Sequence, residues 1–137
     1  MTNVHLATAS VNALADALKT RTDIGSGAAT ITVYNGTQPA TANTALSGNT
    51  ALATFTLDDP SFGSASAGVI TMAGVPRSTT GLAAGTATFF RMFSSDPFTI
   101  LDGDVGTASA TLILNTTTIS VGVAVSITAG TFTVPPG

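Results

Sequence analysis

The spacing of apolar residues divides this chain into a helical part and a strand-like part. In the first part, apolar residues recur three and four positions apart, which lines one face of a helix. Gly25 and Gly27 end this pattern, after Lys19 and Arg21 have placed positive charge where the helix dipole favours it. Residues 1–24 are therefore predicted to form a helix or arm that docks on its own domain or, alternatively, on a neighbouring subunit. The apolar stripe consists of Val4, Ala7, Val11, Leu14 and Leu18.

From residue 28 to residue 134, apolar positions alternate with Thr and Ser, which is the period of a strand with one buried face. Thr is β-branched and suits a half-buried pleated surface. The segments between these runs are rich in turn-forming residues, and we interpret NG, SGNT, DDP, TTGLAAG, SSDP and LDGDVG as turns. The predicted strands are 29–34, 51–57, 68–75, 86–93, 110–115, 118–128 and 131–134.

Short strands at this spacing predict a mainly β fold, either an antiparallel β-sandwich or a jelly-roll-like barrel, with a short N-terminal α-helix. The sequence supplies no crossover helices of the kind that parallel strands need. A length of 137 residues is typical of one domain. We therefore predict a single domain over 1–137, with a helix or arm in 1–24 and the β domain in 28–134. The segment 39–49 is neither periodic nor charged, and it is predicted to be a surface loop.

The predicted strand 86–93 carries apolar residues on both faces. This pattern predicts a central strand that is buried on both sides, and a buried guanidinium needs a carboxylate or carbonyl partner. Asp96 and Asp102 are the candidate acids for Arg91. A groove for an aromatic ligand is the functional alternative to core packing. Alternation places Phe89, Arg91 and Phe93 on one face, and Phe90 and Met92 on the other.

Charged residues make up only 8% of the chain, with a net charge of −3 and no Glu, whereas soluble domains carry about 25%. Scattered charges keep soluble proteins apart. The low charge therefore favours a surface that is covered by copies of the chain or by a larger assembly, and neutral drift in a Thr-rich β protein is the alternative. The basic residues form no patch, which argues against a nucleic-acid partner. They are Lys19, Arg21, Arg77 and Arg91.

Residues that catalyse reactions or bind metals are scarce. Cysteine is absent, which excludes thiolate catalysis and Cys-ligated zinc. We interpret the single histidine, His5, as an ordinary polar residue, because no Ser-His-Asp set or GxSxG motif accompanies it. The acid pairs in 58–59 and 102–104 could act as acid and base or bind Ca²⁺, but DDP and DGD are also turn sequences. We predict no enzyme activity, no catalytic residues, no cofactor and no metal, and leave open whether Asp102 and Asp104 bind an ion.

The beginning of the sequence lacks the basic and continuous apolar regions of a signal peptide. No apolar run reaches the roughly 18 residues that a membrane-spanning helix needs. We therefore expect synthesis without signal-dependent export, and no membrane partner.

Several motifs resemble a group of small phage and prophage virion proteins. LADAL (14–18) precedes a GSG turn and the strand and arm ATITVYNGTQPA, and LATFTLDDPSFG, ATFFRMFSSDPFTILDGDVG and SITAGTFTVPPG continue the pattern over nearly the whole chain. The resemblance implies a structural part of a virion, first of all a decoration or cement protein on the outer capsid surface. It implies the major capsid protein and copies of the chain itself as partners, with a homotrimer as one option. Synthesis would take place in the host cytoplasm.

Two other assignments stay open. One is a tail or neck component, such as a head–tail completion, tube or fibre-attachment protein. The other is a carbohydrate-binding or adhesin-like β module, which needs exposed aromatic rings, whereas this chain has no Trp and one Tyr. For assembly on a virion, we expect the helix stripe and the loop 39–49 to make the contacts. The predicted contact residues are Val4, Val11, Leu14, Leu18, Tyr34, Pro39 and Leu46.

Overall fold

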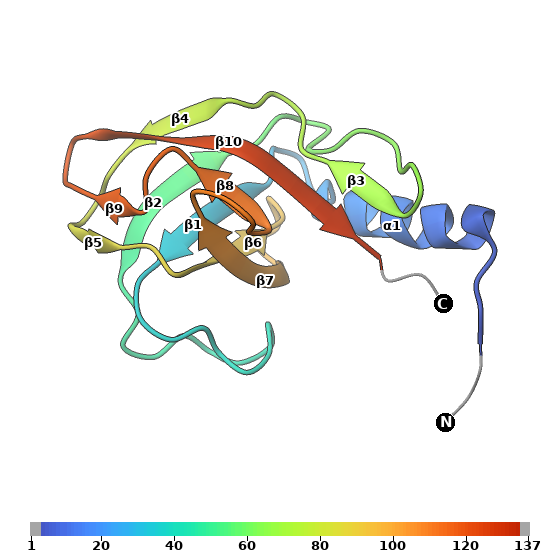
Figure 1. The fold of residues 1–137 in the computed structure, drawn as a ribbon, viewed down its shortest axis with the longest axis horizontal. Coiled ribbons are helices and arrows are strands. Elements are labelled where there is room, and N and C mark those ends of the chain that lie inside the picture. Colours follow the sequence, from blue (N-terminus) through green and yellow to red (C-terminus); the bar gives the residue numbers. More distant parts are fainter. Residues whose placement is uncertain (1–3, 135–137) are drawn as a thin grey trace.

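In the computed structural model, which describes residues 4–134, helix α1 spans Thr8–Thr22 and packs beside strand β3 (Val69–Thr71) (Figure 1). An Ala-rich sequence favours this helix. Its buried residues are Val11, Ala15 and Thr22. The helix approaches the β domain closely, because a Cβ atom added to Gly68 would lie only 2.5 Å from Cγ1 of Val11.

The predicted apolar stripe coincides only in part with the buried face of α1. Val11 is buried and Leu18 is half-buried, but Leu14 is 50% exposed and Val4 is 63% exposed. Val4 does not belong to the helix, because residues 4–7 form an N-terminal arm that precedes it. The stripe was predicted from the largest apolar side chains, whereas the docking face contains the small Ala15, which lets the helix lie close to the sheet.

The strands mostly follow the predicted alternation of apolar and Thr residues, with the exceptions described below. In chain order they are β1 (Thr30–Tyr34), β2 (Ala51–Thr56), β3 (Val69–Thr71), β4 (Arg77–Thr80), β5 (Gly85–Thr86), β6 (Phe89–Phe93), β7 (Thr99–Gly106), β8 (Leu112–Leu114), β9 (Thr118–Ile119) and β10 (Ala124–Thr133).

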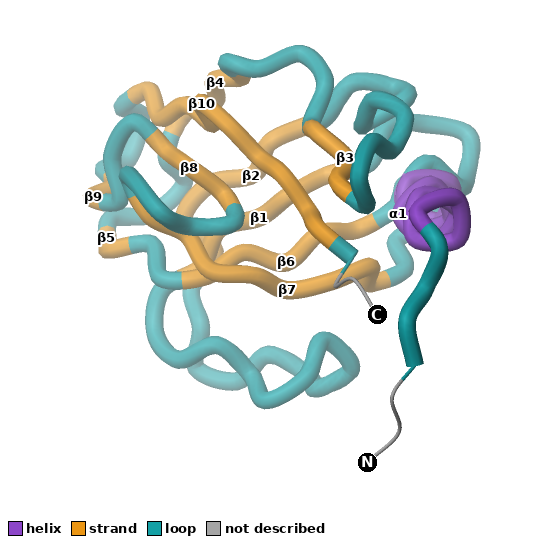
Figure 2. Tube along the Cα trace, turned by 45° about the vertical axis from the view of Figure 1, so that its right-hand side comes forward, coloured by secondary structure: helices purple, strands orange, loops and turns teal. Residues whose placement is uncertain are grey.

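The main sheet has the strand order β2-β1-β6-β7-β8-β10-β3, and β4 pairs with β10. It curls into a half-barrel (Figure 2). The curl brings β4 back toward β2, where the Leu82 N–H donates to the Leu52 carbonyl at 2.7 Å. The prediction of a mainly β fold with a short N-terminal helix is confirmed. A smaller sheet pairs β5 with β9.

One strand pair of the main sheet is parallel, which the sequence did not predict. β7 and β8 pair in parallel through Val105 with Leu112 and Gly106 with Ile113. The short loop 107–111 makes the connection without a crossover helix. The loop 107–111 is long enough for a parallel connection because only two residues of each strand are paired.

The core fills the inside of the curl, and β6 is its central strand. β6 lies between β1 and β7, and Phe89, Phe90, Arg91 and Met92 are all buried. This arrangement confirms the prediction of a strand that is covered on both sides. The Phe132 ring of β10 packs against the Phe90 ring, with centroids 5.9 Å apart.

Two segments that were predicted to lie between strands are found inside them. LDGDVG belongs to β7, and β10 runs without interruption through residues 129 and 130. Cβ atoms added to Gly103 and Gly130 would lie 2.6 Å from the Phe90 ring and 2.8 Å from the Met72 methyl group. These glycines leave room for core side chains and do not form turns.

Further strand boundaries differ from the prediction. The predicted strand 68–75 is shortened to β3, and the predicted strand 86–93 is divided between β5 and β6. Two more differences lie beside β10. The predicted strand 118–128 is divided between β9 and β10 by a corner at 120–123, where Gly122 has a φ of +73°. The first residues of the predicted turn TTGLAAG belong to β4. Tertiary pairing sets the boundary of β4 and the start of β10, because β4 pairs with the first half of β10.

Candidate functional site

The predicted contact residues do not share one surface. Tyr34 is only 8% exposed, and its ring stacks on Phe89 with centroids 5.3 Å apart. Burial raises the pKa of the Tyr34 hydroxyl above its ordinary value. Val11 is likewise buried, against Gly68. Both residues are therefore part of the interior of the chain, and their prediction as contact residues for a partner is corrected.

The other predicted contact residues are accessible to different degrees. Val4 and Leu14 are exposed, on the N-terminal arm and on α1. Leu18 is half-buried and faces β7 and β10 across a groove. Pro39 and Leu46 are half-buried in the loop 35–50, which projects beyond the sheet (Figures 1 and 2).

The base of the loop 35–50 is tied to the β domain by polar side chains. The Asn49 side chain donates to the carbonyls of Asn35 and Thr37 at 2.9 and 3.2 Å. Thr88 donates its hydroxyl to the Gly36 carbonyl at 2.6 Å. The loop is therefore anchored at both ends, although its sequence has no periodicity.

The face of the sheet opposite the core carries a buried ion pair. Arg91 of β6 donates from Nε and Nη2 to the two carboxylate oxygens of Asp102 on β7, at 2.6 and 2.8 Å. The hydrogen bonds to Asp102 raise the pKa of Arg91 above its ordinary value. Asp102, and not Asp96, is thus the partner of the buried guanidinium. Because each charge is neutralised by the other, the pair has the geometry of a structural contact.

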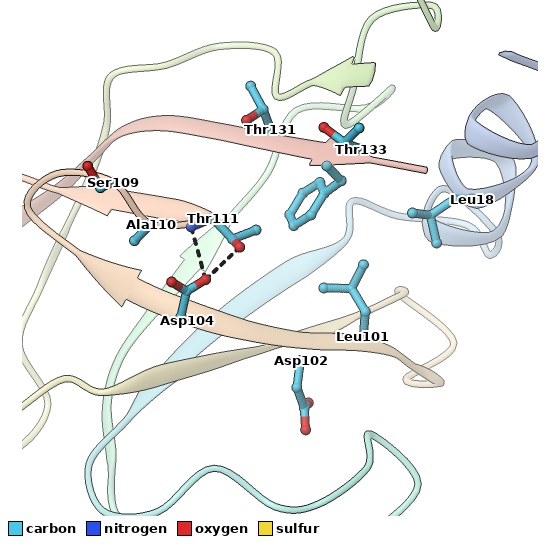
Figure 3. Close-up of a pocket in the computed structure, with 10 residues that line it drawn as sticks. Leu18, Leu101, Asp102, Asp104, Ser109, Ala110, Thr111, Thr131 and Thr133 are labelled. Carbon is cyan, nitrogen blue, oxygen red and sulfur yellow. Dashed lines mark hydrogen bonds between the residues drawn. The ribbon is translucent and has the colours of Figure 1, made fainter. Parts of the chain in front are cut away.

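Asp104 forms hydrogen bonds with Thr111 and takes no part in the ion pair. One of its carboxylate oxygens accepts the backbone N–H and the hydroxyl of Thr111 at 3.0 and 2.6 Å. These hydrogen bonds lower the pKa of Asp104 below its ordinary value. Asp104 thereby fastens the loop 107–111 to β7. Figure 3 shows that Asp102 points away from Asp104, so the two carboxylates do not converge.

The remaining acids gather nowhere into a metal site in residues 4–134, because no group of three Asp, Glu, His or Cys side chains there is suitably close. Asp58 and Arg77 form an ion pair with each other. Within the same range, no helix has the length and apolar character needed to cross a membrane.

An open groove of about 570 Å³ lies between α1, β7 and β10 (Figure 3). Leu18, Leu101 and Phe132 form its apolar part, and threonines of β10 and the loop 107–111 form much of the remainder. Among its lining residues, the ionisable groups are Asp102, which points away and is paired, and Asp104, which is bonded to Thr111. The groove therefore offers shape and backbone groups, and no set of residues for acid–base chemistry.

The segments 81–84 and 120–123 lie at the end of the half-barrel that is far from α1 (Figure 1), and both carry exposed apolar residues. Leu82, Val121 and Val123 are 59%, 67% and 58% exposed, and we call them the corner patch. Two hydrogen bonds of 2.9 Å hold them together, from the Gly81 N–H to the Val123 carbonyl and from the Gly122 N–H to the Gly81 carbonyl. Exposed apolar residues that lie together favour contact with a partner.

A second exposed group lies where α1 ends. Ile24 and Phe98 are 41% and 48% exposed, and we call them the helix-end patch. The Arg21 guanidinium lies 4.7 Å from the centroid of the Phe98 ring. Ser95 ties the two segments together, because its hydroxyl accepts the Gly27 N–H at 3.1 Å and donates to the Ile24 carbonyl at 3.3 Å.

Sequence reasoning missed both patches. The alternation places the two valines of the corner patch in a predicted strand, and only the corner at 120–123 exposes them. Phe98 follows the predicted turn SSDP and lies outside every predicted strand, so the alternation gives no indication of its exposure. Comparisons of the chain with protein-family models, with curated proteins and with solved structures gave no match.

Proposed function

We propose that this chain is a structural protein of a phage virion, a decoration protein that binds the outer capsid surface in many copies. The observation that carries the proposal is the presence of exposed apolar patches on a chain with only 8% charged residues. Such a surface is poorly suited to a free monomer, and contact with an assembly covers it. The resemblance of the sequence to small virion proteins supports the same function.

The separation of the patches fits a protein that bridges its neighbours. The corner patch lies at one end of the half-barrel, whereas the helix-end patch lies where α1 leads into β1. A decoration protein needs more than one contact surface, because it touches several coat subunits at once. We assign the corner patch and the helix-end patch to these contacts.

The proposal is tested by rebinding. Purified protein should bind capsids that lack it, at dozens to hundreds of copies per particle, an order of magnitude set by icosahedral repetition. Val123→Asp should abolish rebinding while its melting temperature stays that of the wild type, because Val123 is already exposed to solvent. Thr71→Asp is the matched control, since Thr71 is an exposed strand residue of β3.

The alternative assignments predict different results. About six or twelve copies per particle would support a neck or tail component, since rings on the virion axis have such symmetries. Full rebinding by Val123→Asp would exclude the corner patch as a capsid contact. The carbohydrate-binding alternative needs exposed aromatic rings, but the single Tyr of the sequence, Tyr34, is buried and cannot stack on a sugar.

A further inference from the structure

Next to β8, one edge of β7 has no neighbouring strand from residues 4–134 over most of its length. One edge of β7 pairs with β6 over residues 99–104, but its other edge pairs with β8 only at residues 105 and 106. In the described chain, no backbone hydrogen bond reaches that second edge between residues 99 and 103. The groove lies along this edge.

The opposite wall of the groove also presents backbone groups. In β10 the Thr131 N–H donates to the Thr111 carbonyl at 3.4 Å, whereas the Val134 N–H donates to the Gly68 carbonyl at 2.9 Å on the side of β3. Backbone groups of a strand alternate between its two sides. Thr133 therefore directs its N–H and carbonyl toward the groove, where no partner is found among residues 4–134.

An extended segment is the ligand that matches both walls. Strand edges with unpaired N–H and carbonyl groups accept a further strand, whose backbone supplies the affinity. Every second side chain of that strand would face Leu18, Leu101 and Phe132. The open edge of β7 is long enough for about five residues, or about 17 Å of strand.

The N-terminal arm, residues 4–7, has the properties of such a strand. Ala7 has the extended angles φ −65° and ψ 150°. Val4 and Leu6 lie two positions apart, so they face the same side of an extended chain, and they are 63% and 39% exposed. The arm leaves α1 on a path away from the body of the molecule (Figures 1 and 2). Its direction suits a neighbouring groove better than the groove of its own chain.

We propose that the arm of one copy adds as a strand to the groove between β7 and β10 of a second copy. Val4 and Leu6 would contact the apolar part of that groove, and the arm backbone would pair with β7 and Thr133. Arm into groove is a head-to-tail contact, which closes into a ring when the rotation permits. The inference deepens the proposed function, on which it rests for the presence of many neighbouring copies.

Cysteine cross-linking tests this contact directly, because the chain has no cysteine of its own. The variants Leu6→Cys and Leu101→Cys, two positions that would lie on the same face of the extended sheet, are purified separately, mixed and oxidised. A disulfide requires Cα atoms within about 7 Å, so a covalent dimer of the two variants is expected. Leu6→Cys mixed with Ser47→Cys, on the exposed part of the loop 35–50, is the matched control.

Two cross-linking results would overturn the proposal. One is a yield of mixed dimer no higher than that of the control. The other is an intrachain disulfide in the double variant Leu6→Cys/Leu101→Cys at low concentration, with monomer mass and no dimer. That second result would assign the arm to the groove of its own chain.

A peptide experiment examines the groove without the arm. Protein lacking residues 1–6 should bind a labelled peptide of residues 2–9, TNVHLATA, in a saturable manner measured by fluorescence anisotropy. Thr133→Pro should abolish binding, because proline removes the backbone N–H that faces the groove. The hydrogen bonds between β10 and β3 do not involve this N–H and are kept. Replacement of Leu6 by proline in the peptide should do the same. Absence of binding by the truncated protein would overturn the proposal.

These experiments separate the strand exchange from the capsid function. Both use the purified chain without capsids, so a negative result overturns the exchange and leaves capsid binding standing. Positive cross-linking together with failed rebinding to capsids would support the strand exchange and overturn capsid binding.

Discussion

At the scale of single residues, Arg91 and Asp102 are the clearest case of polar groups placed inside the protein. Their side chains are 6% and 4% exposed. Removal of two charges from water costs several kcal/mol, so such a pair adds little net stability. We infer that it specifies register instead, because only one alignment of β6 and β7 sets Arg91 opposite Asp102.

Removal of one member of the pair should be far more harmful than removal of both. Asp102→Ala is expected to lower the free energy of unfolding by about 3–5 kcal/mol, since it leaves the guanidinium buried without a partner. The double variant Arg91→Met/Asp102→Leu should recover most of that loss. Urea unfolding measures both values. A single variant that loses less than about 1 kcal/mol would contradict a buried structural pair.

Gly103 is the position in β7 at which we expect an added side chain to be most destabilising. A methyl group there would meet the Phe90 ring at 2.6 Å. Gly103→Ala should therefore lower the free energy of unfolding by about 1–3 kcal/mol, the usual cost of overpacking. Gly63→Ala is the control, because the nearest atom to its added methyl group is the Thr71 carbonyl oxygen at 3.9 Å. Equal melting temperatures for the two variants would show that the Phe90 ring can move aside.

At the scale of elements, α1 shows how a helix can dock through small side chains. Ala15 is completely buried, whereas the neighbouring Leu14 is half exposed. The helix buries residues 11, 15 and 22, which fall on one side of a 3.6-residue turn. Leu14 is thereby left available for a partner in an assembly.

The two neighbouring positions of α1 should respond in opposite ways to the same charge. Ala15→Asp should lower the free energy of unfolding by more than about 2 kcal/mol, because it buries a charge without a partner. Leu14→Asp should change it by less than about 0.5 kcal/mol, as exposed substitutions do. Thermal unfolding of the isolated protein measures both. A large loss of stability in Leu14→Asp would restore the stripe that was predicted from the sequence.

At the scale of the whole molecule, the curl of the sheet creates the features that we assign to assembly. β8 and its loop are too short to fill the space between β7 and β10, so the groove remains. At the other end, the corner between β9 and β10 exposes the two valines of the corner patch. An exposed arm at one place and an open groove at another allow copies to join without loss of the fold of each.

The period of apolar and Thr residues, read along the chain, determined the class of the fold. It predicted the helix near the N-terminus, most of the strands and the double-sided burial of β6. It also predicted that Arg91 needs a carboxylate or carbonyl partner. These features could be predicted because they depend on residues close together in the sequence, which local backbone geometry places on one face or another.

Tertiary structure alone decided which distant residues meet, and the candidate surfaces follow from those meetings. Asp102 became the partner of Arg91 through the register of two strands. Gly103 and Gly130 look like turn residues in the sequence, yet each leaves space for a side chain of another strand. The corner patch and the groove likewise depend on how the sheet curls. The physical reason is that burial and close contact are set by three-dimensional packing, which a period along one strand does not contain.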